Sequence, residues 1–159
     1  CLVIPQFNVM RNTLLGAHFL FAGIWLGCVL TEALFERALL AGDRRSHLRL
    51  AALHMRVDKY IELPAIFIVL FTGTALWFHG HSSGTAATIM VFAGLVAIAA
   101  NLFCVALVLR RHSAAQSGDW LQFDQLDHLQ HKIGGLVLVG LLVALCAGIW
   151  ARGASQASI

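Results

Sequence analysis

The sequence is poor in charged residues. Only 12% of its 159 residues are Asp, Glu, Lys or Arg, whereas a soluble globular domain has about 25%. Hydrophobic residues make up 59% of the chain. A chain with so few charges cannot cover its surface with polar groups in water. We therefore infer that the protein lies in a lipid bilayer. The net charge is only +3, and the sequence has no basic run interleaved with aromatic residues. Both observations argue against nucleic acid as a partner.

Common catalytic motifs are also missing. The sequence has no Gly-x-Ser-x-Gly elbow and no phosphate-binding loop. Its cysteines form no Cys-x-x-Cys pair, which argues against a structural zinc site. The three methionines form no ladder of soft ligands for copper(I). Whether the protein is an enzyme stays open at this stage.

Long apolar segments dominate the chain. They cover residues 13–31, 63–78, 86–109 and 133–151, and a membrane-spanning helix needs about 17–25 residues. The second segment is short, but an amphipathic stretch before it extends the same helix. We therefore predict one all-α domain, a four-helix transmembrane bundle with helices at about 12–40, 46–79, 86–111 and 126–151. A polar loop is expected between the last two helices.

The basic residues are unevenly distributed. Nine of the eleven Lys and Arg residues fall between the first and second segments or between the third and fourth. Because Lys and Arg favour the cytoplasmic side, both termini are expected outside. The localisation that follows is a bacterial inner membrane. All eight carboxylates fall at the same, cytoplasmic ends of the segments.

One ladder of ionisable residues leads into the second apolar segment. His54, Asp58 and Glu62 are four residues apart, so a helix places them on one stripe. If the first two helices are antiparallel, Glu36 lies near His54, and Glu32 lies near Asp58 or Glu62. The fourth helix adds two further imidazoles at this level, those of His128 and His131.

Together these residues offer the mixture of carboxylate and imidazole that iron, zinc, copper or manganese accepts in helical bundles. The alternative is a salt-bridge network at the membrane surface. It would join Asp58 and Glu62 to nearby cations, namely Arg56, Lys59, Arg110 or Lys132.

A second candidate site lies toward the other end of the first helix. His18 is 14 residues from Glu32, or roughly 21 Å along a helix, so one ion cannot bind both. An imidazole within a membrane helix can ligate haem iron, with His79 or His81 as the second axial ligand. In the alternative, His18 is a hydrogen-bonded core residue and the other two histidines are solvated.

Two segments resemble a known family. His18 with Trp25-Leu-Gly27, and the stretch from Pro64 through Gly73 to Trp77, resemble the first two helices of the CopD-like and HemJ-like bacterial membrane proteins. The match covers about a third of the chain. This resemblance implies a small membrane bundle that binds haem b through His18. HemJ-like proteins are linked to protoporphyrinogen oxidation and CopD-like proteins to copper uptake.

The leading hypothesis is therefore a membrane redox protein. It would bind haem b at His18, with a second iron, copper or zinc ion or a proton relay at the other cluster. Two further hypotheses remain open. One is a transport component for copper or another cation, and the other is a non-catalytic subunit that associates with other membrane subunits or with a second copy of itself.

Overall fold

Long helices account for almost all of the structure. The computed structural model describes residues 3–39, 44–79 and 84–156. The elements are α1 (Val3–Leu39), α2 (Arg44–Val57), the π-helical turn η1 (Asp58–Glu62), α3 (Leu63–His79), α4 (Thr85–Ser117) and α5 (Trp120–Gln156). The fold is all-α, as the apolar segments predict.

Four spans in this bundle are long and apolar enough to cross a membrane: Val9–Arg37, Arg44–Phe78, Thr85–Ser117 and Trp120–Ala151. The second span joins α2, η1 and α3 without a break. The chain is therefore an integral membrane protein with a bundle of four spanning helices. Large apolar side chains face outward along every span, as a bilayer solvent requires.

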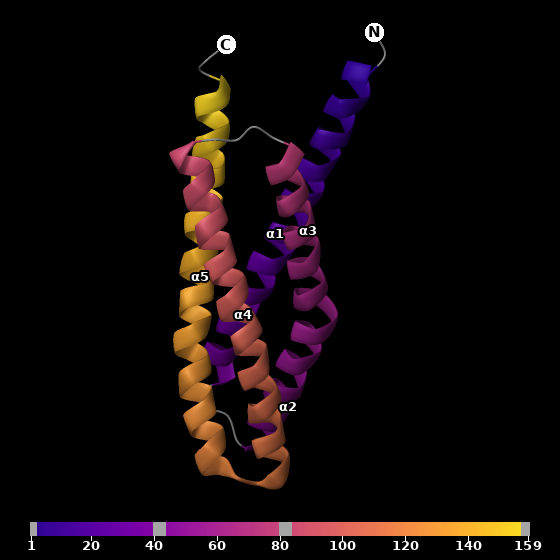
Figure 1. The fold of residues 1–159 in the computed structure, drawn as a ribbon. Coiled ribbons are helices and arrows are strands. Elements are labelled where there is room, and N and C mark those ends of the chain that lie inside the picture. The colour runs from indigo at the N-terminus through magenta and orange to yellow at the C-terminus, as the bar shows by residue number, and fades with distance from the viewer. Residues whose placement is uncertain (1–2, 40–43, 80–83, 157–159) are drawn as a thin grey trace.

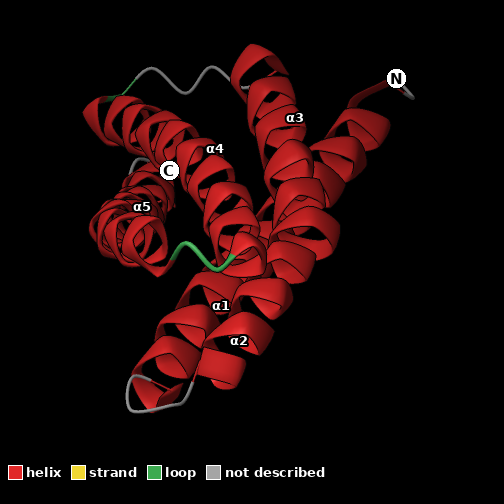
Figure 2. Cartoon of the chain, turned by 90° about the horizontal axis from the view of Figure 1, so that it is seen from below, coloured by secondary structure: helices red, strands yellow, loops and turns green. Residues whose placement is uncertain are grey.

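The helices form two pairs, α1 with α3 and α4 with α5. Figure 1 shows α4 lying beside α5, whose last turns extend beyond the start of α4, while α1 crosses beside α3. The first turns of α1 and the last turns of α5 lie at one end of the bundle, and α2 and the α4–α5 turn lie at the other (Figure 1). Seen from below, α1 and α2 lie next to each other on one side of α4 and α5 (Figure 2).

The connection between α4 and α5 is much shorter than the polar loop that we predicted. Gly118 ends α4 in the left-handed conformation, with φ of 78°, and its N–H bonds to the carbonyls of Ala114 and Ala115. Asp119 is the N-cap of α5, because its Oδ1 accepts a hydrogen bond from the N–H of Gln122 at 3.0 Å. A glycine stop and an aspartate N-cap thus reverse the chain within two residues.

Two cores hold the bundle together. Trp25 is the largest residue of the first core, with Ala65, Ile66, Ala97, Val137 and Leu141 around it. The second core lies nearer the α4–α5 turn and contains Ala51, Ala114, Ala115 and Phe123. Several ionisable side chains are buried as well, namely those of His54, Asp58, Glu62 and Arg111.

The α4–α5 contact depends on small residues. A Cβ at Gly140 would lie 3.0 Å from the Cβ of Ala97 and 3.3 Å from the carbonyl oxygen of Ala93. Neither atom can move without its helix. We predict that Gly140→Val destabilises the protein by about 1–3 kcal/mol through overpacking.

The control for this prediction is Gly135→Val, because a Cβ at Gly135 meets no atom within 4 Å. Unfolding of both variants in detergent, followed by circular dichroism, measures the difference. Equal stability of the two variants would show that the helices do not approach each other closely at Gly140.

Candidate functional site

Three carboxylates from two spans meet inside the bundle. Glu32 comes from α1, and Asp58 and Glu62 come from η1. One oxygen from each lies within 4.8 Å of the others. Asp58 is 3% exposed and Glu62 is 2% exposed. We call these three residues the buried carboxylate centre.

The π-helical turn supplies two members of this centre. In η1 the N–H of Leu63 bonds to the carbonyl of Asp58, five residues earlier. Pro64 follows directly and has no N–H to offer the carbonyl of Tyr60, so regular α-helical bonding cannot continue across this point. Such wide turns within helices are often found at functional sites. Here the turn holds Asp58 and Glu62 on the buried side of the helix.

Two polar side chains orient Glu62 from the opposite side. Asn101 of α4 donates through Nδ2 to Glu62 Oε2 at 3.0 Å. Trp25 of α1 donates through Nε1 to Asn101 Oδ1 at 3.3 Å. Because Asn101 is itself bound, its amide has one orientation, and this fixes one oxygen of Glu62. Asn101 is a polar residue within the apolar segment 86–109, and the sequence predictions gave it no role.

The buried carboxylate centre lacks counter-charges. Among the described residues no Lys or Arg forms an ion pair with any of the three carboxylates. One oxygen of each is buried without a hydrogen-bond partner, namely Glu32 Oε1, Asp58 Oδ2 and Glu62 Oε1. Ionised carboxylates are costly to bury unpaired and repel one another at this spacing. The centre is therefore suited to hold protons or a metal ion.

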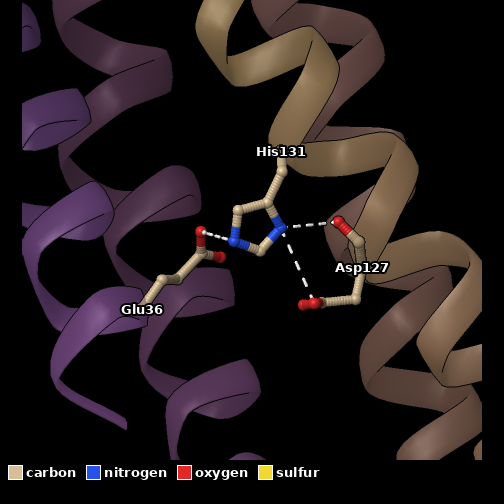
Figure 3. Close-up of side chains that lie close together, drawn as sticks. All are labelled: Glu36, Asp127 and His131. Atoms are coloured by element: carbon tan, nitrogen blue, oxygen red, sulfur yellow. Dashed lines mark hydrogen bonds and ion pairs between the residues drawn. The ribbon is translucent and has the colours of Figure 1, made fainter. Parts of the chain in front are cut away.

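A second cluster lies nearer the α4–α5 turn. It contains Glu36 of α1 and Asp127 and His131 of α5, whose ligand atoms also lie within 4.8 Å of one another. We call it the Glu36 cluster (Figure 3). His131 Nε2 lies 2.8 Å from Glu36 Oε2, and His131 Nδ1 lies 2.8 Å from the backbone oxygen of Asp127. A carbonyl oxygen only accepts, so Nδ1 carries a proton.

Unlike the buried carboxylate centre, the Glu36 cluster contains its own cation. Arg111 of α4 is 1% exposed and donates from Nη1 to Glu36 Oε1 at 3.2 Å. The same nitrogen donates to Asp127. Arg111 Nη2 lies 2.9 Å from His54 Nδ1. A guanidinium cannot accept a hydrogen bond, so His54 Nδ1 is the acceptor and the imidazole is neutral with its proton on Nε2.

Several predicted neighbours do meet. His54 Nδ1 lies 3.4 Å from Glu36 Oε1, and Glu32 lies beside Asp58 and Glu62. Both contacts were expected from an antiparallel arrangement of the first two helices. Whether these residues bind a metal stays a prediction.

Two details differ from the prediction. The buried cation is Arg111 rather than Arg56, Lys59, Arg110 or Lys132, and all four of these side chains are exposed. The ion pairs that Arg111 forms join Glu36 and Asp127, not Asp58 and Glu62. His128 is exposed on the outer face of α5, near Asp124 and Lys132. It is not one of the three residues whose ligand atoms lie close together in the Glu36 cluster, and its role as a metal ligand stays a prediction.

His18 lies elsewhere, between α1 and α3. Its Nδ1 is 3.0 Å from Thr72 Oγ1, and the Thr72 hydroxyl in turn donates to the carbonyl of Ile68 at 2.6 Å. Thr72 must then accept the His18 proton, which leaves Nε2 as the nitrogen with a free lone pair. The ring also packs against Gly73, where a Cβ would lie 3.1 Å from His18 Cε1. The predicted partners of His18 lie outside the described residues: His81 entirely, and His79 in its side chain.

Comparisons with family models, curated proteins and solved structures found no match to the chain. The resemblance to CopD-like and HemJ-like proteins therefore stays a prediction, and the site must be interpreted from its own geometry.

Asn101 provides a direct test of how the buried carboxylate centre is held. We predict that Asn101→Leu lowers the free energy of unfolding by about 1–3 kcal/mol, because it leaves both Trp25 Nε1 and Glu62 Oε2 buried without their partner. Phe103→Leu is the control, since Phe103 is an exposed residue of the same helix. Thermal unfolding in detergent would contradict the prediction if Asn101→Leu and Phe103→Leu were equally stable.

Proposed function

We propose that this protein is a membrane redox protein with one divalent metal ion, Mn²⁺ or Fe²⁺, bound at the buried carboxylate centre. The observation that supports this most strongly is the imbalance of charge between the two clusters. Arg111 compensates Glu36 and Asp127, whereas Glu32, Asp58 and Glu62 bring three carboxylates together without an ion pair to any described Lys or Arg. A divalent ion would neutralise two of these three charges.

The ligand type supports the choice of metal. Oxygen ligands suit Mn²⁺ and Mg²⁺, and carboxylates in helical bundles also hold iron. Soft copper(I) prefers thiolates and thioethers, which do not belong to this set. Asn101 and Trp25 act as outer partners that orient Glu62, the kind of support that metal ligands require. Of the oxygen-preferring ions, Mn²⁺ and Fe²⁺ can change oxidation state, so either could pass electrons.

Access to the centre supports a resident ion. Toward the first residues of α1, the Trp25 core closes the bundle with apolar side chains. Toward the α4–α5 turn, the Glu36 cluster offers polar groups, and His131 is 41% exposed. We therefore place the route to the centre on the side of the Glu36 cluster. A route of this kind suits metal loading and proton exchange for a redox centre better than it suits passage of an ion through the membrane.

The orientation in the membrane belongs to the same proposal. Most of the described Lys and Arg side chains lie at the end of α1, on α2 and η1, and toward the end of α4, and basic residues favour the cytoplasmic side. The Glu36 cluster then faces the cytoplasm of a bacterial inner membrane, with both termini on the opposite side.

Metal analysis tests the proposal. The purified protein, dialysed against Mn²⁺ in detergent, is expected to retain one ion per chain. Glu62→Gln removes a charge and a ligand oxygen, so it should lose stoichiometric binding. Asp124→Asn is the matched control, because it neutralises an exposed carboxylate of α5, and it should bind as the unmodified chain does. Equal retention by Glu62→Gln and Asp124→Asn would refute the assigned site.

Two further measurements examine the remaining parts of the proposal. Iron-loaded protein should cycle between the ferrous and ferric states without losing iron, and an ion that stays inert would contradict the redox role.

Mn²⁺ should load the protein in inside-out vesicles but not in sealed right-side-out vesicles. The reverse preference would overturn the proposed orientation.

Haem b at His18 is a second candidate, and one observation favours it. His18 Nδ1 lies 3.0 Å from Thr72 Oγ1, and a haem-ligating histidine characteristically binds iron through one nitrogen while the other donates a hydrogen bond. We predict a Soret band for protein purified from haem-supplied cells, which His18→Ala should abolish. His47→Ala is the control, since His47 lies on α2 against Phe123. A spectrum without a Soret band would exclude this candidate.

A further inference from the structure

Arg111 occupies an unusual position for a guanidinium. It is buried in a span of the bundle and contacts three other helices, through Glu36 of α1, His54 of α2 and Asp127 of α5. Its planar face also lies 5.6 Å from the centroid of the Phe123 ring. An arginine keeps its charge in nearly any protein environment. A permanent cation is therefore fixed between the carboxylates of the Glu36 cluster.

These carboxylates, with His131, would otherwise be a set of metal ligands. Glu36, Asp127 and His131 provide two carboxylates and an imidazole, and their ligand atoms lie within 4.8 Å of one another. Iron, manganese and zinc all accept this combination. A further oxygen lies close by: Gln130 donates through Nε2 to Glu36 Oε1 at 3.3 Å, and its own Oε1 is buried without a partner. Gln130 is only 5% exposed.

We propose that Arg111 fills a latent second metal site and so restricts the protein to a single bound ion. The inference rests on the proposed function only for the first ion, at the buried carboxylate centre. The Arg111 guanidinium bonds to the same two carboxylates that a second ion would need. Without Arg111, the Glu36 cluster would hold two partly buried carboxylates with only His131 beside them, and a divalent cation would restore the balance of charge.

A second ion would also displace a proton at the contact between His131 and Glu36. His131 Nδ1 donates to the backbone of Asp127, and one proton is shared between Nε2 and Glu36 Oε2 at 2.8 Å. To serve as a ligand through Nε2, His131 would release that proton and keep its Nδ1 bond. The second ion would thus replace two positive groups, the guanidinium and this proton.

The test is a count of ions per chain in full-length protein. Mn²⁺ is used as the probe, and bound metal is measured after equilibrium dialysis in detergent. The unmodified chain should bind one ion and Arg111→Gln should bind two. Arg111→Lys retains the positive charge and should bind one. Arg110→Gln removes the same charge from the exposed neighbouring position and should also bind one.

Double variants locate the additional ion. Arg111→Gln combined with Asp127→Asn should return to one ion, because the new site loses a ligand. Arg111→Gln combined with Glu62→Gln should also bind one, now at the Glu36 cluster. If the unmodified chain binds no ion and Arg111→Gln binds one that depends on Asp127, the proposed function fails while this inference stands. A single ion in Arg111→Gln, insensitive to Asp127→Asn, overturns the inference.

Loss of Arg111 can also unfold the bundle, so stability is a second readout. Circular dichroism of Arg111→Gln and of the smaller Arg111→Ser should show a higher unfolding temperature as Mn²⁺ is added, because an ion that binds only the folded state stabilises it. The Mn²⁺-dependent increase should exceed that of Arg110→Gln. If neither Arg111 variant is stabilised beyond the Arg110→Gln control, Arg111 is a purely structural residue and the inference is wrong.

Discussion

The interior of this bundle is organised around the repulsion between three carboxylates that share one apolar environment. Glu32, Asp58 and Glu62 lie too close together and too far from solvent to remain ionised without a compensating charge. The neighbouring structure is consistent with this constraint. A π-helical turn and a proline fix two of the carboxylates, Asp58 and Glu62, and Asn101 fixes one oxygen of Glu62. A purely structural core would gain more from apolar residues at these positions.

The Glu36 cluster solves the same problem in a different way. Its carboxylates are paired with Arg111 and His131, so protein groups supply all of the positive charge. Removing one partner of such a buried network is costly because it leaves the others unpaired. The network also joins all four spans at one level, and it can therefore fix their register. The Glu36 cluster has its charges balanced without a ligand, whereas the buried carboxylate centre requires bound protons or a cation.

Much of this arrangement could be predicted from the sequence because it depends on helical periodicity. The spacing of His54, Asp58 and Glu62 placed them on one stripe, and an antiparallel first pair of helices brought Glu36 to His54. The role of Arg111 was missed, although a signal exists. Buried residues of α4 recur at spacings of three, four or seven residues, as one face of a helix requires. They include Ala97, Asn101, Val108, Arg111 and Ala115. This spacing places Arg111, and not Arg110, on the inner face of α4.

Other features could not be derived from helical periodicity. The polar composition around Gly118 and Asp119 led us to predict a loop instead of a tight turn. A glycine followed by an aspartate is nevertheless a known signal for ending one helix and starting another. The contacts of Asn101 with Trp25 and Glu62 depend on the packing of three helices. His128 was grouped with His131 because the two are three residues apart, but of these two histidines it is His131 that contacts Glu36.

The assignment of the ion to the buried carboxylate centre is tested most directly by pulsed electron paramagnetic resonance of the Mn²⁺-loaded, unmodified protein. This measurement detects nitrogen nuclei bound to the manganese. We expect no directly coordinated imidazole nitrogen, because the ligands are oxygens of Glu32, Asp58 and Glu62. A coupling from a coordinated nitrogen would place the ion at His131 or His54 instead and would contradict the assignment.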